Sequence, residues 1–438
     1  MKTKIISSLL ALTTLSAQAQ NSPEEKFNMA MYAVTNMYVD SVNKAQFVDT
    51  EIAKMLQSLD PFSEYLPPVT AKANEEVITG KPATNLSAPA DSSQSKGKTP
   101  LVGMLPSTIK SHYMATKNTG YICLSMFSET TLADFRKALA ELKKKGLKNL
   151  VLDLRNNGGG LFDAAVALAD EFLDGDKLIV STKGAHIPSE SFKAKVKGNM
   201  EKGRLVLLVG DQTKSAAEIF SAAIRDWDRG VLVGKTTFGK GLIQETLPFS
   251  DGSALRITVA RYLTPAGMSI QKPYKGMATA DSTRVWKSLL THRPLKCRGG
   301  VEADVDVEPN ADYMTNWYAL ITYSGVQTAV GKKYVQDLKA QLLKKYPNAD
   351  SFIKEYDTPE ELMKAVCQTA EGAGIPTDKT DYARSEAMVK AQMKAVICSQ
   401  LYQDNNLYYK LFNAQNNVMK RALEIIDGKE YNEILNRK

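Results

Sequence analysis

The segment Asn149-Leu150-Val151-Leu152-Asp153-Leu154-Arg155-Asn156-Asn157-Gly158-Gly159-Gly160 joins a short apolar run to a glycine-rich turn. The run is typical of a strand that is buried on both faces of a parallel sheet. Three consecutive glycines before a helix permit a turn whose N–H groups point at an anion. The segment therefore predicts an α/β core with an anion-binding turn at the end of one strand.

Strands and helices alternate on both sides of this segment. Apolar or alternating runs predict strands at residues 120–127, 205–209, 231–233 and 253–263, and amphipathic runs predict helices at 130–145 and 161–173. Such alternation is typical of an α/β fold. We expect the α/β core to occupy residues 105–310.

The flanking segments have a different character. Residues 20–71 predict a helical segment that gives way to extended backbone at Pro67-Pro68. Residues 72–104 are rich in Lys, Ala, Ser, Thr, Asn, Pro and Gly, and this composition predicts a flexible linker. Residues 311–438 predict a separate helical domain, with helices at 317–346, 359–372 and 384–426.

The composition and the apolar runs argue against nucleic-acid binding and against a membrane-spanning segment. The chain has 438 residues with 43% hydrophobic content, which is enough for a large core. Its formal net charge of +8 is modest and no basic-aromatic stripe accompanies it, so we expect no nucleic-acid partner. After residue 19 no segment carries the roughly 18 apolar residues that span a bilayer, so we expect no integral membrane segment.

The first 19 residues predict a signal peptide. Lys2 and Lys4 precede a mostly apolar stretch, residues 5–17, and Ala17-Gln18-Ala19 supplies a small-residue cleavage signal. We therefore expect an exported protein, either periplasmic or secreted.

The cysteines and histidines form no metal-binding motif. The four cysteines are widely spaced (Cys123, Cys297, Cys367 and Cys398), and the three histidines are isolated from them and from each other (His112, His186 and His292). Export permits a disulfide between Cys367 and Cys398, and buried free thiols are the alternative. We expect no metal site.

Ser215 is the first candidate catalytic residue. It stands in Thr213-Lys214-Ser215-Ala216-Ala217-Glu218, at the start of a predicted helix. There its hydroxyl would lie beside free backbone N–H groups, and the Ala216 N–H would help to hold an oxyanion. The alternative is structural, because Ser215-x-x-Glu218 also fits a capping box, in which the serine only caps the helix.

Lys240 is the candidate base for this serine. A lysine acts as a base where apolar surroundings favour its neutral form, and Leu242 and Ile243 offer such surroundings. Gln244 is well placed to orient the amine. The alternative is an ordinary surface lysine. Together, Ser215 and Lys240 suggest a nucleophile that is activated by an amine.

Two other motifs, a phosphate-binding loop and a Ser-His-Asp triad, fit this sequence less well. Gly234-Lys235-Thr236 has some likeness to a phosphate-binding loop, but only three residues separate it from Gly230, and the predicted strand 231–233 lies inside the would-be loop. A Ser-His-Asp triad is open in principle, yet none of the histidines has a supporting glycine or carboxylate motif. The sequence thus favours the lysine-based arrangement over an NTPase or a triad.

Taken in order, the motifs resemble the C-terminal processing peptidases, also called tail-specific proteases. The resemblance runs from about residue 55 to 308. The segments that carry it are 59–66, 151–161, 215–219, 234–241, 251–255, 261–267 and 299–305.

The resemblance implies a crotonase-like α/β core and serine endopeptidase activity near protein C-termini. The implied roles are nucleophile for Ser215, general base for Lys240, holder of the lysine for Gln244, and oxyanion N–H donors for Ala216 and either Gly159 or Gly160. It implies polypeptide substrates and no metal or organic cofactor.

One departure from the family's pattern lies between residues 66 and 107. Family members usually carry a PDZ domain there, a fold of roughly 80 to 100 residues that binds peptide ends by strand addition. This chain has a linker-like segment of about 40 residues instead. We expect the PDZ domain to be missing, which leaves a place for an adaptor or regulatory protein of the envelope. The alternative interpretation is a catalytically weak or inactive scaffold that binds envelope proteins.

Overall fold

The computed structural model describes residues 22–79, 107–275, 277, 285–296 and 298–437. The chain forms two compact units, Met1–Tyr65 and Leu66–Lys438. The predicted signal peptide and residues 80–104 of the predicted linker lie outside the described residues, as does Cys297. Within the described ranges, none of the helices is both long and apolar enough to cross a membrane.

Residues 22–65 of the first unit contain two helices, in agreement with the helical spacing of their apolar residues. Helix α2 (Pro23–Met37) begins with a capping box between Ser22 and Glu25. Helix α3 (Lys44–Gln57) begins after Asn43, whose side chain caps the first turn. Residues 38–43 separate the two helices.

Helix α4 (Pro68–Thr79) follows the short strand β1 (Glu64–Leu66) and corrects two predictions. Pro68 begins the helix, because its fixed φ and missing N–H suit the first turn, so the predicted extended backbone does not continue through it. Residues 72–79 of the predicted linker are helical, since alanine, lysine and glutamate in this run favour a helix over irregular structure.

The core of the second unit is a mixed sheet. In order across the sheet, the strands are β13 (Val305–Asp306), β8 (Val231–Gly234), β7 (Leu205–Val209), β4 (Asn149–Asp153), β3 (Thr119–Leu124) and β2 (Ile109–Met114). All neighbours are parallel except β2 and β3. Val151 of β4 lies between Tyr121 and Val206 of the adjacent strands. This sheet confirms the predicted α/β class.

Three helices cover one face of this sheet: α5 (Thr131–Lys144), α6 (Phe162–Asp170) and α7 (Ala216–Asp226). Phe135, Leu168 and Phe220 of these helices join one buried core with Leu152 and Leu207 of the strands. The helices predicted at 130–145 and 161–173 are thereby confirmed. Helix α7 is buried along its whole length, so its first turn has a fixed place at the end of β7.

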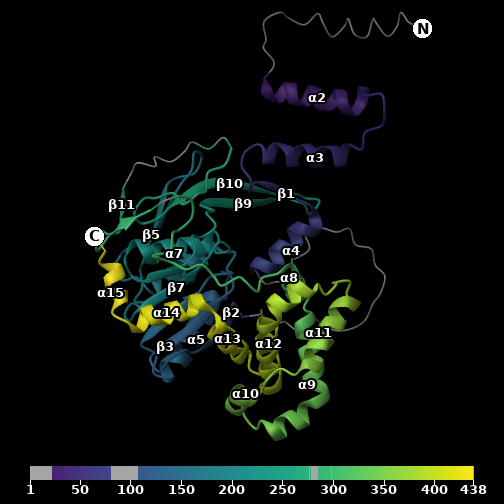
Figure 1. The fold of residues 1–438 in the computed structure, drawn as a ribbon. Helices are drawn as coiled ribbons and strands as arrows, with labels where there is room; N and C mark the ends of the chain where they lie inside the picture. The colour runs from purple at the N-terminus through teal and green to yellow at the C-terminus, as the bar shows by residue number, and fades with distance from the viewer. Residues whose placement is uncertain (1–21, 80–106, 276, 278–284, 297, 438) are drawn as a thin grey trace, which may run out of the picture. The chain divides into compact units, whose positions relative to one another are not determined.

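The opposite face is covered by the C-terminal helices α13 (Asn405–Gln415), α14 (Asn417–Asp427) and α15 (Glu430–Leu435), drawn in yellow tones in Figure 1. Ala422 and Ile425 of α14 share a buried cluster with Val206 and Val233 of the sheet. The structure therefore differs from the predicted division at residue 311. An apolar stripe on α14 packs on the sheet, which makes the end of the chain part of the core.

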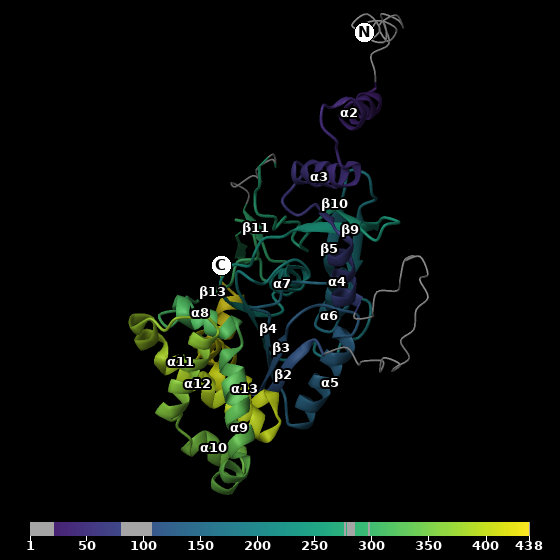
Figure 2. The same ribbon diagram turned by 90° about the vertical axis from the view of Figure 1, so that its right-hand side faces the viewer.

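A bundle, seen in Figure 2, is formed by helices α8 (Asn316–Tyr323), α9 (Val326–Lys345), α10 (Ala349–Glu355), α11 (Glu360–Gly372) and α12 (Lys379–Tyr402). Its buried core includes Trp317, Phe352 and Met393. This bundle confirms the predicted helical C-terminal region.

Cys123, Cys367 and Cys398 are free thiols, so the disulfide alternative for Cys367 and Cys398 is wrong.

A second, antiparallel sheet contains β9 (Leu242–Pro248), β10 (Ala254–Leu263), β5 (Leu178–Lys183) and β6 (Glu190–Lys193). Of these strands, the sequence predicted β10 alone. Two further short strands, β11 (Trp286–Lys287) and β12 (Pro294–Leu295), pair with each other. The pairing of β9 with β10 matters for function, because it places Gln244 opposite Thr258 and fixes the chain that follows Lys240.

Candidate active site

The candidate residues gather where three neighbouring parallel strands end. The glycine turn follows β4, the segment 210–215 follows β7, and the segment 235–241 follows β8. In open α/β sheets, ligands bind outside the carboxyl ends of the strands. Direct backbone bonds tie the three segments together: the Lys214 N–H donates to the Asn157 carbonyl oxygen at 3.0 Å, and the Phe238 N–H donates to that of Thr213 at 3.0 Å.

Ser215 holds an unusual backbone conformation at the start of α7. It is the N-cap residue, with φ 53° and ψ −117°. A positive φ is rare for a residue with a side chain, and such strained positions cluster at functional sites. The residue is half-buried, so part of its surface is in contact with solvent.

Glu218 binds the backbones on both sides of the site. Its Oε2 accepts the N–H of Ser215 and the N–H of Lys240, each at 2.9 Å. Its Oε1 accepts the Thr237 hydroxyl at 2.5 Å and the Gly239 N–H at 2.7 Å. Four donors thus converge on one carboxylate that has no exposed surface. Burial raises the pKa of Glu218, although these hydrogen bonds oppose that shift.

Tyr262 joins the same two residues through their carbonyl groups. Its hydroxyl lies 2.8 Å from the carbonyl oxygen of Lys240 and 3.2 Å from that of Ser215, and donates to both. The ring is buried, and burial raises the pKa of the hydroxyl well above its ordinary value. The hydroxyl therefore keeps its proton at every pH where the protein would be assayed. Ser215 and Lys240 are bridged twice, once through N–H groups and once through carbonyl groups.

The Lys240 amine has a defined partner. Its Nζ donates to Oε1 of Gln244 at 2.6 Å. Lys240 is half-buried just before β9, and Gln244 lies inside that strand. The structure thus brings Gln244 to Lys240, as the sequence predicted, and the bridges of Glu218 and Tyr262 bring the Lys240 backbone to that of Ser215.

The glycine turn packs directly on Ser215. A Cβ on Gly159, whose φ is 101°, would lie 2.9 Å from the Ser215 Cβ and 2.8 Å from the Lys214 carbonyl oxygen. Gly160 has φ 133°, and a Cβ there would lie 1.9 Å from the Phe127 carbonyl oxygen. Side chains are therefore excluded at both positions. This is the physical reason for glycine at positions 159 and 160.

The two glycines differ in what their N–H groups do. The Gly159 N–H donates to Asn157 Oδ1 at 2.9 Å, so this donor is already used. Among the hydrogen bonds of residues 107–275, the N–H groups of Gly160 and Ala216 donate to no protein acceptor. Gly160 and Ala216 are therefore the better pair of candidate oxyanion donors, and Gly159 supplies the close backbone approach.

Sequence reasoning missed the roles of Glu218 and Tyr262. In the sequence Glu218 fits a helix cap, but it is also an acidic residue in the otherwise apolar run Ala216-Ala217-Glu218-Ile219-Phe220. A buried acidic side chain needs several hydrogen-bond donors. The acid in this apolar run therefore indicated that Glu218 would bind several neighbouring groups. Tyr262 gave no comparable signal, because it lies in a strand where a buried aromatic residue is ordinary.

The histidines lie in other surroundings. His112 Nε2 is 2.8 Å from Glu141 Oε2 of α5, and His292 Nδ1 is 3.2 Å from the Ser288 carbonyl oxygen. Neither contact includes Ser215. Within the described part of the chain, no group of three or more His, Cys, Asp or Glu side chains is arranged to hold a metal ion.

The chain has relatives among known proteins. Residues 118–278 match peptidase family S41, and residues 317–404 match a family of unknown function (DUF8443). Over 158 residues the chain is 42% identical to a chloroplastic C-terminal processing peptidase of Tetradesmus obliquus, a match that covers 36% of this chain and 34% of that protein. Over 159 residues it is 40% identical to the carboxy-terminal processing protease CtpA of Bacillus subtilis (strain 168), again covering 36% and 34%.

These matches span about a third of the length of each of those relatives. A solved structure, the photosystem II D1 C-terminal processing protease, aligns over 66% of this chain and 94% of its own, with 25% identity and a TM-score of 0.40. Both relatives are named for C-terminal processing of proteins.

Proposed function

We propose that this chain, whose residues 118–278 belong to peptidase family S41, is a serine-type peptidase that cleaves polypeptides. Ser215 is the nucleophile and Lys240 is the general base. The observation that carries the proposal is the double bridge by which Glu218 and Tyr262 hold the backbones of Ser215 and Lys240 together. The contact between the Lys240 amine and Gln244 further supports it.

The proposed reaction proceeds through an acyl-enzyme. The neutral amine of Lys240 takes the proton of the Ser215 hydroxyl as its oxygen attacks the amide carbonyl carbon. The N–H groups of Ala216 and Gly160 stabilise the negative charge on the carbonyl oxygen. The Lys240 ammonium then gives its proton to the departing amine. Water, activated by Lys240 in the same way, releases the acyl group and restores Ser215.

The proposed substrates are polypeptides cut near their C-termini. This part of the proposal rests on the two relatives, whose names describe carboxy-terminal processing. It also rests on the family resemblance of the motifs between residues 59 and 305. Since the segment between α4 and β2 is shorter than a PDZ domain, we propose that another surface, or an envelope adaptor protein, selects the substrate.

We also propose that the protein acts outside the cytoplasm. Residues 1–19 have the charged start, the apolar stretch and the Ala17-Gln18-Ala19 site of a signal peptide. Cell fractionation and N-terminal sequencing of the mature protein test this directly. A mature protein that begins at Gln20 supports export, and a cytoplasmic chain that retains Met1 contradicts it.

The activity is tested with purified mature protein on an unfolded, carboxymethylated protein and on peptides labelled at their C-terminal ends. Ser215→Ala and Lys240→Ala should each lower kcat by at least about 10³-fold. Ser221→Ala and Lys235→Ala are matched controls. The Ser221 hydroxyl donates to the Ala217 carbonyl oxygen of its own helix, and Lys235 forms surface ion pairs.

Mass spectrometry of the products shows where each substrate is cut. Because the proposed base is an amine, EDTA should leave turnover unchanged. Equal turnover by wild type, Ser215→Ala and Lys240→Ala would exclude the mechanism. No turnover by the wild type on any polypeptide would favour the scaffold interpretation.

A further inference from the structure

The side chain of Arg155 connects the end of β4 to the C-terminal helices. Arg155 comes two residues after the last residue of that strand, at the start of the glycine turn. Its Nη1 donates to Asn416 Oδ1 at 2.8 Å, and its Nη2 lies 3.3 Å from Asn413 Oδ1. Asn413 belongs to α13, and Asn416 is the residue between α13 and α14. This contact crosses about 260 positions of sequence.

Asn413 is buried, Arg155 and Asn416 are half-buried, and the charge of Arg155 is paired. The Arg155 guanidinium also binds Asp153 through Nε at 3.0 Å and through Nη2 at 2.6 Å. The Tyr121 hydroxyl donates to Asp153 at 2.7 Å, and Asn413 Nδ2 donates to the Tyr113 hydroxyl at 3.0 Å. Bidentate arginine–carboxylate contacts fix orientation more strictly than single hydrogen bonds do. The guanidinium is therefore held in one place.

The glycine turn that follows is anchored at a second point. Asn157 Nδ2 donates to the Leu124 carbonyl oxygen at 3.1 Å, and the Asn157 carbonyl oxygen accepts the Lys214 N–H at 3.0 Å. Between these anchors and Ser215 stands Gly159, whose backbone leaves no room for a Cβ. A shift of Arg155 would therefore be passed along a short, tightly packed turn to Ser215.

We propose that Arg155 is a positioning residue, and that the α13–α14 junction sets the place of the glycine turn through Asn413 and Asn416. This inference rests on the proposed function, because it gives the turn the task of presenting an oxyanion N–H. Asn413 and Asn416 lie outside both matched segments, 118–278 and 317–404. In this proposal the C-terminal helices position the glycine turn of the candidate site.

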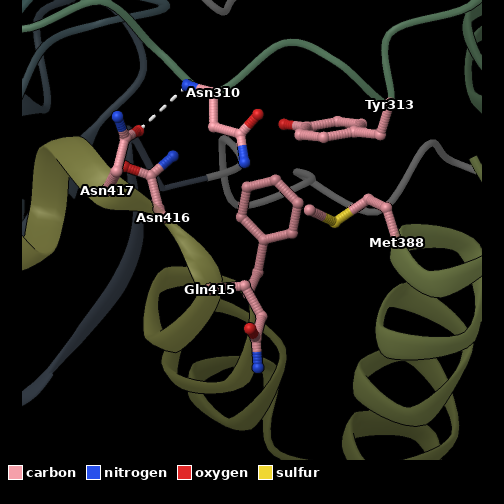
Figure 3. Close-up of a pocket in the computed structure, with 7 residues that line it drawn as sticks. Asn310, Tyr313, Met388, Gln415, Asn416 and Asn417 are labelled. Atoms are coloured by element: carbon pink, nitrogen blue, oxygen red, sulfur yellow. Dashed lines mark hydrogen bonds between the residues drawn. The ribbon is translucent and has the colours of Figure 1, made fainter. Parts of the chain in front are cut away.

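The junction also borders a small pocket, shown in Figure 3. Asn416 and Asn417 lie at the start of α14, and Asn417 accepts the Asn310 N–H at 3.1 Å. Gln415 lines the same pocket but does not bind Arg155. Gln415 therefore offers a control substitution beside Asn416, in the same pocket and outside the connection.

The test separates the two hydrogen bonds that Asn416 Oδ1 accepts. This oxygen caps α14 by accepting the Met419 N–H at 3.0 Å, and it also accepts from Arg155. Serine is a good N-cap residue but is too short to serve both donors, whereas aspartate can serve both. Asn416→Ser thus removes the Arg155 contact and keeps the cap, Asn416→Asp keeps both, and Gln415→Ala is the control.

We expect Asn416→Ser to lower kcat about tenfold with KM within about twofold, because small misplacements of catalytic groups reduce turnover strongly. Asn416→Asp and Gln415→Ala should retain kcat within about threefold. Thermal unfolding should give similar midpoints for Asn416→Ser and Asn416→Asp. A loss of kcat that follows the loss of Tm across the variants would overturn the proposal, since the role would then be only structural.

Hydrogen–deuterium exchange supplies a readout that does not need activity. In Asn416→Ser, amides of the peptide covering residues 154–161 should exchange faster than in wild type, and Asn416→Asp should restore their protection. Unchanged exchange of this peptide in Asn416→Ser would overturn the positioning role. If the wild type cleaves nothing, the peptidase proposal fails, but the exchange result still decides whether the junction holds the turn.

Discussion

Glu218 and Lys240 are joined across 22 positions of sequence, because Glu218 Oε2 accepts the Lys240 N–H at 2.9 Å. The same oxygen accepts the Ser215 N–H at 2.9 Å. One buried carboxylate in the first turn of α7 thus determines where the two candidate catalytic backbones stand relative to each other. The acid contributes geometry to the site, although it is too deeply buried to contact a substrate.

Glu218→Gln should destabilise the fold and impair the site together. Glutamine has a single acceptor oxygen, so some of the four donors would face an NH₂ group. Each buried donor left unpaired costs about 1–3 kcal/mol. We expect a loss of about 2–4 kcal/mol in the free energy of unfolding at pH 7, measured by urea denaturation, and a lower kcat.

The pH dependence of this loss gives a further check. The raised pKa of Glu218 means that the folded protein binds this proton more tightly than the unfolded chain does. The contribution of Glu218 to stability therefore falls as the pH rises above the ordinary value of 4.5. Glutamine has no such dependence, so the cost of Glu218→Gln should be larger at pH 5 than at pH 8. A cost that increases with pH would contradict the direction of the shift.

Gly159→Ala should inactivate the site while Gly158→Ala should not. An alanine at 159 would adopt a strained positive φ and place its Cβ 2.9 Å from that of Ser215. The strain alone costs about 1–2 kcal/mol, and displacement of Ser215 should lower kcat about 100-fold. A Cβ on Gly158 meets no heavy atom within 4 Å. Equal turnover of the two variants in the peptide assay would refute the close packing of this turn on Ser215.

Gln244→Glu should move the pH–rate profile. A carboxylate at the position of Oε1, 2.6 Å from the Lys240 amine, favours the ammonium form and so depletes the base. The rising limb of kcat against pH should shift upward by about one unit. Gln244→Ala removes the contact without adding a charge, so it should lower kcat without this upward shift.

Glu245→Gln, the neighbouring residue of β9, controls for the change of charge because its side chain is exposed. Its profile should coincide with that of the wild type. If Gln244→Glu left the limb in place, Lys240 would not be the group that titrates.

The sequence predicted the central strands of the main sheet well, because the apolar pattern of each strand lies within the strand itself. Strands β4 and β7 are buried on both faces, so each is a continuous apolar run that can be recognised without its neighbours. Strand β2, Ile-Lys-Ser-His-Tyr-Met, is a half-exposed edge strand, and its mixed composition gave no comparable signal. Likewise, the apolar stripe of α14 predicted a helix but not the surface that it covers.

The candidate site was predicted in its residues but not in its connections. Ser215, Lys240 and Gln244 were identified from motifs, and the contact between Lys240 and Gln244 spans only four positions. Three of the four hydrogen bonds in the bridges through Glu218 and Tyr262 span 22 to 47 positions, so they depend on strand order and on the loop after β8. The positive φ of Ser215 is likewise set by the packed surroundings and not by the identity of the residue.

Tyr262→Phe should separate the function of the second bridge from its effect on stability. Phenylalanine fills the same buried space but leaves the carbonyl groups of Ser215 and Lys240 without this donor, at a cost of about 1–3 kcal/mol. Tyr431→Phe is the matched control, because its buried hydroxyl accepts the Leu205 N–H at 3.1 Å, on the sheet face that α14 and α15 cover. Both variants should lose comparable stability in urea denaturation.

Only Tyr262→Phe should also lower kcat, by about tenfold. The Tyr262 hydroxyl, unlike that of Tyr431, holds the backbones of Ser215 and Lys240 together. The loss should be the same at all assay pH values, because the raised pKa of Tyr262 keeps its hydroxyl protonated throughout. Turnover numbers for both variants, measured where each is fully folded, check this. Equal kcat for Tyr262→Phe and Tyr431→Phe would mean that the Glu218 bridge alone suffices to align the two residues.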